Sequence, residues 1–289
     1  MTSVIVQPVE KNAAIEEHTQ ELLQLEALLL ARAYAYELLS KLLGGTPDED
    51  ILRAVTEKTT QDVFEEYADA SEELGVFAEL LCSLRAADSD AVLDGMRGEY
   101  TRIFIGPAAL PASPYESPYI SSHDTALFQE NTIATRRCYA HAGLAPKRVQ
   151  AIPDDHIAMM LSFMAVMSAR TLEDYLSGNL ESLREALREQ RMFAKEHMGS
   201  WLDVFATSVR NSEVGEKATL YPQLLEALSA FVKIDRSFLV ESLYWASTQG
   251  QIDAREPAEE LTEARTALHE LKALLPLGAS DFEMIPIKS

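Results

Sequence analysis

Residues 22–45 read LLQLEALLLARAYAYELLSKLLGG, and this stretch decides the fold class. Apolar side chains recur in it every three or four residues, the spacing that places them on one face of an α-helix. The glycine pair at its end favours a helix C-terminus at Gly44. Because Glu26, Arg32 and Lys41 interrupt the apolar run, we expect a core helix rather than a membrane span.

The same period returns along most of the chain, and no segment combines strict alternation with the β-branched density of a strand. The sequence therefore predicts an all-α protein, a single globular helical bundle of about ten helices. Thr46-Pro47-Asp48-Glu49 would begin a second helix. Further helices are expected at about 61–69, 72–86, 89–104, 123–142, 154–176, 179–197, 199–210, 217–232, 235–247 and 261–275.

The expected domain organisation has three parts. Residues 1–20 are typical of a mobile N-terminal arm, residues 21–249 of the helical domain, and residues 250–289 of a linker, an amphipathic helix and a tail. The one long irregular stretch, residues 106–121, carries four prolines, which fix φ and prevent helix formation. A loop of that length in a compact domain is usually functional or disordered, and its tyrosines argue against disorder. A hinge-like segment is expected at 143–152.

Composition excludes some functions and leaves others open. The 289 residues carry 46 acidic and 25 basic side chains, a formal net charge of −21. Nucleic-acid binding needs clustered Lys and Arg, so we expect no nucleic-acid partner. The acidic surface favours a cationic partner or serves solubility alone. Two cysteines, no secretory signal and no apolar run long enough for a bilayer indicate a cytoplasmic protein with no membrane span.

Two loop-to-helix junctions hold the most informative polar residues. The first reads EYTRIFIGP at 99–107 and LPASPYESPY at 110–119, and the second reads PDDHI at 153–157. One interpretation of the second is structural, with Pro153 at the first helical position and two carboxylates stabilising the helix N-terminus. A binding site and a catalytic site are the other interpretations. Neighbouring helical side chains point about 100° apart, so three consecutive residues do not converge on one metal ion.

Other sites lack complete signatures. Cys138 and His141 are one helical turn apart, but no second ligand pair accompanies them, so we expect no metal and no cofactor. The sequence contains neither a phosphate-binding loop nor a nucleophile elbow. The Met-rich run at 159–167 is either core or an adaptable apolar surface for a partner.

At these motifs the chain resembles the TorD/DmsD/NarJ family of redox-enzyme maturation chaperones. The resemblance rests on three stretches, Glu99-x-x-Arg102-x-Phe104-x-Gly106-Pro107, Pro114-Tyr115-Glu116-Ser117-x-Tyr119 and Pro153-Asp154-Asp155-His156-Ile157. A looser match is Phe193-x-x-x-His197-Met198-x-x-Trp201-x-x-x-Phe205. The likeness covers about 25–245. The chain departs from the family pattern at Tyr115, where Trp is common, and at Met160, where Glu is common.

The resemblance implies an all-helical, TorD-like cytoplasmic chaperone that is not an enzyme. Such proteins bind the twin-arginine leader, and often the body, of a molybdenum-cofactor oxidoreductase precursor. They hold the precursor until cofactor insertion, before export. The family's leader-binding positions correspond here to Pro114, Tyr115, Glu116, Ser117, Asp155 and His156, and we add the apolar neighbours Phe104, Tyr119, Met160 and Met164.

A leader of this kind is a basic segment followed by an apolar stretch, and an acidic protein with a methionine- and aromatic-lined groove complements both parts. Two alternatives stay open: an assembly factor for a respiratory reductase that is never exported, and a nucleotide hydrolase using Asp155 and His156. Domain-swapped dimers occur in the family, and 143–152 is a candidate hinge for such a homodimer. If Asp155 and His156 only open a helix, replacing either should leave the domain folded.

Overall fold

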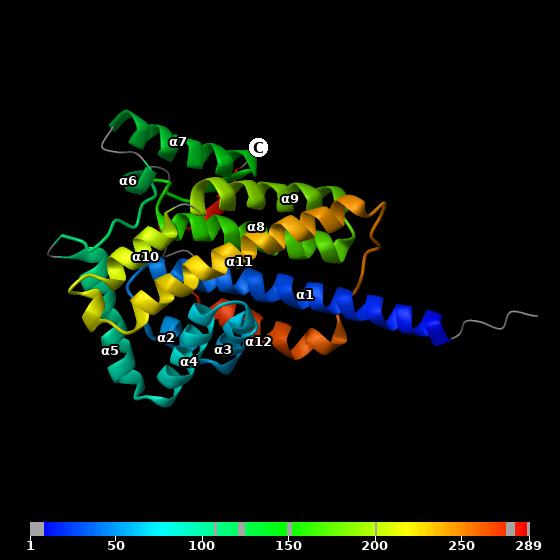
Figure 1. Ribbon diagram of the computed structural model, residues 1–289, viewed down its shortest axis with the longest axis horizontal. Coiled ribbons are helices and arrows are strands. Elements are labelled where there is room, and N and C mark those ends of the chain that lie inside the picture. The colour runs from blue at the N-terminus through cyan, green and yellow to red at the C-terminus, as the bar shows by residue number, and fades with distance from the viewer. Residues whose placement is uncertain are drawn as a thin grey trace, which may run out of the picture.

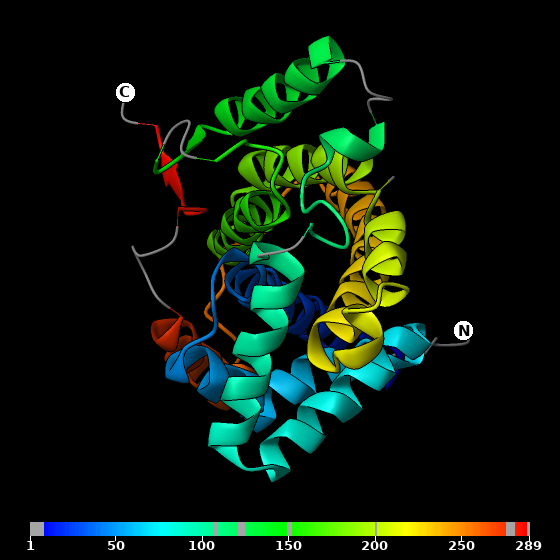
Figure 2. The same ribbon diagram turned by 90° about the vertical axis from the view of Figure 1, so that its left-hand side faces the viewer.

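One long helix, α1 (Val9–Gly44), runs through the molecule, and the other helices pack around it (Figure 1). The structure is a computed structural model that describes residues 9–106, 109–120, 125–148, 152–199, 201–275 and 281–287. Seen from one end, the short helices that follow α1 lie on one side of it (Figure 2). Helices α7, α8 and α9 lie on the other side, with α7 outermost. The molecule is therefore a layered helical body.

Twelve α-helices lie in the described part of the chain, eleven of them of seven residues or more. The all-α prediction is therefore confirmed. After α1 they are α2 (Glu49–Thr56), α3 (Lys58–Glu65), α4 (Glu72–Ala86), α5 (Ser89–Tyr100), α6 (Ser117–Ile120), α7 (Thr125–His141), α8 (Ile157–Ser177), α9 (Leu180–Phe193), α10 (Leu202–Arg210), α11 (Leu220–Thr248) and α12 (Thr262–Leu274). Shorter turns are the 3-10 helices η1 (Ala68–Ala70), η4 (Gly215–Lys217) and η5 (Glu259–Leu261), and the π-helices η2 (Thr101–Ile105) and η3 (Ala194–Met198).

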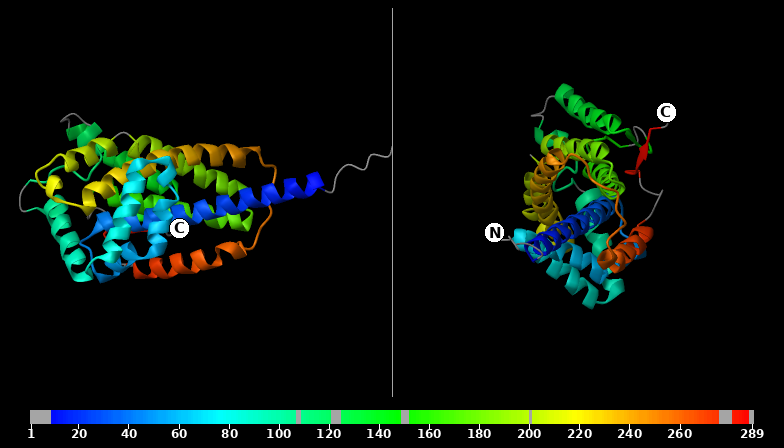
Figure 3. Two further views of the ribbon diagram at one scale, coloured as in Figure 1. Left: turned by 60° about the horizontal axis from the view of Figure 1, so that its bottom comes forward. Right: turned by 90° about the vertical axis from the view of Figure 1, so that its right-hand side faces the viewer.

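Some helix boundaries differ from the predicted ones. α1 begins at Val9, so a helix occupies much of the expected N-terminal arm, of which residues 1–8 lie outside the described residues. Its first turns project beyond the other helices (Figure 3). The helices expected at 217–232 and 235–247 are one continuous helix, α11, because neither proline nor glycine separates them.

A buried ion pair joins α1 to α11. The Arg32 guanidinium donates two hydrogen bonds to the Asp235 carboxylate, and both residues are buried. The Tyr36 hydroxyl donates to the same carboxylate at 2.7 Å. α1 also packs along α8, whose methionines Met159, Met160, Met164 and Met167 are buried. The centre of the core therefore lies between these three long helices.

A small antiparallel sheet ties the C-terminal end of the described chain to its middle. β1 (Leu144–Pro146) pairs with β2 (Met284–Pro286). Strands of three residues are too short to show a two-residue period, so the sequence pattern does not predict them. β1 lies in the hinge-like segment 143–152, of which residues 149–151 are outside the described residues.

The expected C-terminal helix is present as α12, which packs against α1 and α2. After it, residues 276–280 are outside the described residues. The division of the chain at residues 20 and 250 stays a prediction.

Candidate functional site

The segment 109–120 lies across the start of α8, and we call it the strap; residues 109–116 are irregular and residues 117–120 form α6. Two backbone hydrogen bonds hold it there. The N–H of Glu116 donates to the carbonyl of Asp155 at 3.1 Å, and the N–H of Ile157 donates to the carbonyl of Pro114 at 2.9 Å. The two motifs that are distant in the sequence are therefore in direct contact.

The side chain of Asp155 anchors the strap through hydrogen bonds. One carboxylate oxygen accepts hydrogen bonds from the N–H and the hydroxyl of Ser117, and the other accepts from the Thr132 hydroxyl at 3.2 Å. Asp155 and Ser117 have no exposed surface. Each oxygen of Asp155 is thus engaged within the protein, and this side chain has a structural role.

Asp154 holds α7 against the same junction. Its side chain forms an ion pair with Arg136 at 2.5 Å, and its backbone carbonyl accepts from the Tyr139 hydroxyl at 2.8 Å. Burial raises the pKa of the Asp154 carboxyl, and the Arg136 guanidinium opposes that change. Both partners come from α7, so this aspartate positions a whole helix.

His156 caps α8, and the helix begins directly after it. The expectation that Pro153 is the first helical residue is therefore wrong. The Nδ1 of His156 accepts a hydrogen bond from the N–H of Ala158 at 3.1 Å. Burial lowers the pKa of His156 to about 3, so the ring is neutral at ordinary pH. Its ring lies between two aromatic rings, with centroids 4.9 Å from Tyr115 and 4.4 Å from Phe282.

The third, looser motif joins the first through a buried ion pair. The Nδ1 of His197 lies 3.0 Å from a carboxylate oxygen of Glu116, which also accepts from the Asn131 side chain at 2.9 Å. The Nε2 of His197 lies 3.6 Å from the sulfur of Cys138. Burial lowers the pKa of His197, but these hydrogen bonds and the Glu116 charge outweigh it and raise that pKa to about 9. The pair is therefore charged at neutral pH.

Aromatic rings close the outer end of the strap. Tyr119 stacks on Trp201 with ring centroids 5.3 Å apart, and it meets Phe205 edge-on. The Trp201 indole donates to the carbonyl of His197 at 2.8 Å. His197 itself lies in the π-helix η3, a widened turn of a kind that is frequent at functional sites. All three motifs thus meet at the strap.

The N-terminal part of the first motif has a different role. The Glu99 carboxylate accepts from three successive backbone N–H groups at the start of α11, those of Thr219, Leu220 and Tyr221. Phe104 packs its ring against the ring of Tyr221 at 5.3 Å. Glu99 is therefore a helix cap that fixes the start of α11 against α5.

The predicted site residues fall into two groups. Seven are buried, namely Pro114, Glu116, Ser117, Asp155, His156, Met160 and Met164, and three are partly exposed, namely Phe104, Tyr115 and Tyr119. Met160 and Met164 are fully buried, so they belong to the core and line no open groove in this conformation.

The sequence interpretation missed two contributors to the site. One is the polar face of α7, which supplies Asn131, Thr132 and Arg136 at helical spacing. The other is the C-terminal segment with Phe282. The alternation of acidic and apolar residues after residue 280 is the only feature of the sequence that indicates an extended segment there. Neither segment shows which distant residue it will contact.

The geometry does not favour an Asp155–His156 catalytic pair. Asp155 bonds Ser117 and Thr132, whereas the Nδ1 of His156 accepts from the backbone. His141 pairs with Glu189 at 2.8 Å, away from the Cys138–His197 contact. Across the residues that the structure describes, no three His, Cys, Asp or Glu side chains gather as a metal site.

The outer face of this region is apolar. Leu110 and Ile120, both in the strap, expose 36% and 48% of their surface, and Ile105 at the end of η2 exposes 60%. Exposed apolar side chains of this kind offer surface for contact with other molecules. The strap therefore presents an apolar outer face above polar anchors.

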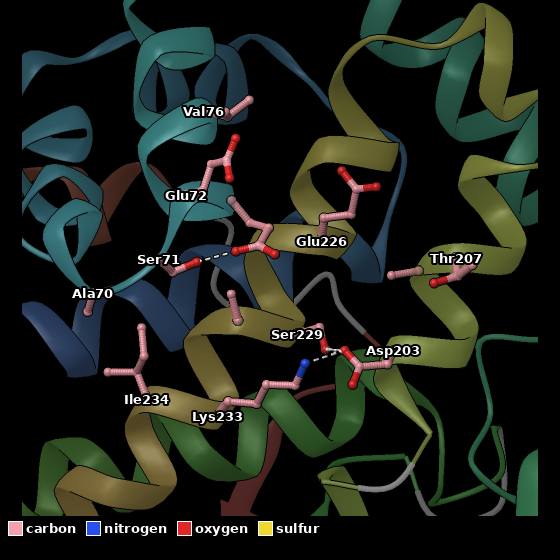
Figure 4. A pocket seen from close by; sticks show the side chains of 13 residues that line it. Ala70, Ser71, Glu72, Val76, Asp203, Thr207, Glu226, Ser229, Lys233 and Ile234 are labelled. Atoms are coloured by element: carbon pink, nitrogen blue, oxygen red, sulfur yellow. Dashed lines mark hydrogen bonds and ion pairs between the residues drawn. The ribbon is translucent and has the colours of Figure 1, made fainter.

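A cavity of about 620 Å³ lies elsewhere, between the start of α4 and helices α10 and α11 (Figure 4). Acidic side chains line it, and most of them have partners. Asp203 accepts from Lys233 and Ser229, and Glu226 pairs with Arg210. No residue of the strap or of the second motif lines this cavity, so we place the candidate site at the strap.

A family model matches about half of this chain, and individual relatives match most of it. Residues 60–207 match the family model described as nitrate reductase delta subunit. The chain is 23% identical over 218 residues to the chaperone protein TorD of Shewanella pealeana, covering 73% of this chain and 91% of that protein. It is 25% identical over 215 residues to the protein of the same name from Shewanella sp. strain MR-4, covering 74% and 96%. No solved structure gives a significant match. Within the described residues, no helix is both long and apolar enough to cross a bilayer.

Proposed function

The chain belongs to the nitrate reductase delta subunit family, and on that premise we propose that it is a chaperone for the precursor of a molybdenum-cofactor oxidoreductase. It captures the twin-arginine leader of that precursor, or its body, by non-covalent contact. It holds the precursor in the cytoplasm until the cofactor is inserted, and then releases it for export. The similarity to TorD chaperones over most of both chains supports this proposal.

One observation carries the proposal: the polar groups of the motifs point inward and the apolar groups of the strap point outward. Glu116, Ser117 and Asp155 are buried and hydrogen-bonded, so they hold the strap in place. Leu110 and Ile120 are exposed and offer apolar area to a ligand. Such an arrangement supports capture by burial of apolar surface. The net charge of −21 supports attraction of the basic part of the leader.

Binding of a synthetic leader peptide tests the proposal. The probe is a labelled peptide with two adjacent arginines followed by an apolar stretch, added to the purified full-length chain. We expect a dissociation constant near 1 μM, about −8 kcal/mol, as for one peptide on one surface. Affinity should fall as salt rises, because charge attraction is screened beyond about 8 Å at physiological ionic strength while apolar burial persists.

Two matched peptides separate the contributions. One replaces both arginines with glutamine, and the other replaces the apolar stretch with serine and glycine. We expect both to bind more weakly than the parent peptide. Equal binding of all three peptides, or no binding of any, would contradict leader capture.

A second candidate function is favoured by the family match itself, which names a nitrate reductase subunit. In that case the chain is an assembly factor for a respiratory reductase that is never exported. Co-purification of the client distinguishes the two. A client subunit with a twin-arginine leader supports the first function, and a client without one supports the second.

A further inference from the structure

The segment Asp281–Ile287, which we call the tail, lies against the second motif although the two are far apart in the sequence. It forms β2, in which Ile285 lies opposite Ala145 of β1. Two flanking hydrogen bonds extend the pairing, from Lys147 N–H to the Glu283 carbonyl at 2.8 Å and from Ile287 N–H to the Gly143 carbonyl at 2.9 Å. Figure 2 shows this strand beside the segment that follows α7. The tail is thus an extended peptide added to a strand edge.

Two tail side chains enter the body at the start of α8. The ring centroid of Phe282 is 4.4 Å from that of His156. Phe282 also packs on Gly44, where an added Cβ would lie 3.1 Å from its ring. Met284 is buried as well, and its N–H donates to the Ser162 hydroxyl at 3.3 Å. Alternate side chains of the tail therefore fill pockets while its backbone pairs with β1, which is a known mode of peptide recognition.

The remaining contacts of the tail are at the surface. Arg148 pairs with Asp281 at 2.6 Å, and Lys147 pairs with Glu283 at 2.8 Å, with the two basic side chains well exposed. Ion pairs of this kind contribute little to stability in water. A short strand with two buried side chains is therefore a contact that a longer peptide of the same character can replace.

We propose that the surface under the tail is part of the client-binding site, and that the tail occupies it until an extended apolar segment of the client replaces it. This inference rests on the proposed function. His156 belongs to the second motif, yet only 7% of it is exposed, and Phe282 covers one face of its ring. The replacing segment is the apolar part of the leader. Its arginines lie away from this edge, because Lys147 and Arg148 repel them.

A reversible cross-link tests the inference in the full-length chain. Ala145→Cys combined with Ile285→Cys places two thiols on directly opposed residues of an antiparallel pair. The Cα separation of such a pair, about 5.5 Å, is within disulfide range. Oxidation then holds the tail on β1, and reduction releases it. The probe is the arginine-plus-apolar peptide described above.

We expect the oxidised double variant to bind the peptide at least about tenfold more weakly than the reduced form, because apparent affinity follows the fraction of molecules with an open surface. The single variant Ala145→Cys is the matched control, and its affinity should not change on oxidation. Phe282→Ala should bind the peptide about threefold to tenfold more tightly than wild type, for the same reason. Ile287→Ala, at an exposed tail position, should bind like wild type.

The outcomes separate the two proposals. Equal affinity of the oxidised and reduced double variant would overturn the role of the tail and leave leader binding intact. Failure of the peptide to bind any variant, including the reduced form and Phe282→Ala, would overturn the proposed function and this inference with it. Because the double variant keeps Phe282 and Met284, poor folding of Phe282→Ala would not weaken the test.

Discussion

The carboxylate of Asp155 accepts two hydrogen bonds from Ser117, one from the backbone N–H at 3.0 Å and one from the hydroxyl at 2.5 Å. Both residues are fully buried, and they belong to different motifs. This contact makes the strap a part of the folded body rather than a free loop. Motif residues that the family resemblance links to client binding are therefore also structural here. Substitutions in them will change stability as well as binding.

The first prediction concerns the anchor itself. Asp155→Ala leaves the N–H and hydroxyl of Ser117 and the hydroxyl of Thr132 buried without this acceptor. We expect the free energy of unfolding to fall by about 3 kcal/mol, the upper range for an orphaned buried donor. Urea unfolding measures the loss. The sequence-based interpretation, in which Asp155 only opens a helix, predicts a smaller loss of about 0.3–1 kcal/mol that leaves the domain folded.

Two variants serve as controls for Asp155. Asp155→Asn keeps the shape and one acceptor oxygen, so it should cost less than Asp155→Ala. Asp69→Ala, at an exposed position, should lie within about 0.5 kcal/mol of wild type. If Asp155→Ala unfolds at the same urea concentration as Asp69→Ala, the carboxylate is not an anchor.

The second prediction concerns Glu99, which caps α11 through three N–H groups. Glu99→Ala should lower the free energy of unfolding by about 2 kcal/mol, the upper end for loss of a helix N-cap. Thermal unfolding followed by circular dichroism measures it. Glu79→Ala, on the exposed face of α4, is the matched control and should melt like wild type. A melting temperature of Glu99→Ala equal to that of the control would refute the capping role.

The sequence predicts the parts of this structure that local periodicity determines. The apolar spacing of residues 22–43 predicts α1, and the prolines of 106–121 predict the irregular part of the strap. They do not predict α6, a four-residue helix in that range that contains Pro118. The motifs also identify which segments of the chain form the candidate site. In each of these cases the information lies within one helix turn or one loop, which a single sequence contains.

What the sequence does not predict is the partner of each polar group. Glu116 and His197 are 81 positions apart, and no local pattern indicates their ion pair. The same is true of Phe282, which contacts His156 although it lies 126 positions further along the chain. Long-range packing decides which carboxylate is buried. From the sequence, Glu116 and Asp155 are interpreted as surface residues that bind a ligand, whereas in the structure they are buried and hold the strap in place.

The third prediction concerns the core ion pair between α1 and α11. Asp235→Ala leaves the buried Arg32 guanidinium and the Tyr36 hydroxyl without their acceptor. We expect a loss of about 3–5 kcal/mol, as for a buried pair with one partner removed. The double variant Arg32→Met, Asp235→Leu should recover much of that loss, because it leaves no unpaired charge. Chemical denaturation of the wild type and the two variants measures both steps, and a double variant less stable than Asp235→Ala would contradict the explanation.

The last prediction is the pH dependence that the Glu116–His197 pair gives to stability. The pKa of His197 is about 9 in the folded protein, above its ordinary value of 6.5. The folded state therefore holds the proton more tightly than the unfolded state. The stabilisation is fully present below about pH 6.5 and is lost as pH rises through 9. It amounts to at most about 3.5 kcal/mol, since each unit of pKa corresponds to about 1.4 kcal/mol.

Cys138 and Glu116 both hold this proton on His197, and Glu116→Gln removes the carboxylate of the two, so the variant should lose less stability than wild type between pH 6 and pH 9.5. Urea unfolding at both pH values measures the difference, and groups that titrate in both proteins cancel in the comparison. The titration of His197 by nuclear magnetic resonance gives an independent value, which should fall in Glu116→Gln. Equal pH dependence in the two proteins, with an unshifted His197, would show that the pair is not charged at neutral pH. The strap would then be held by Asp155 and the aromatic stack on Trp201 without help from this pair.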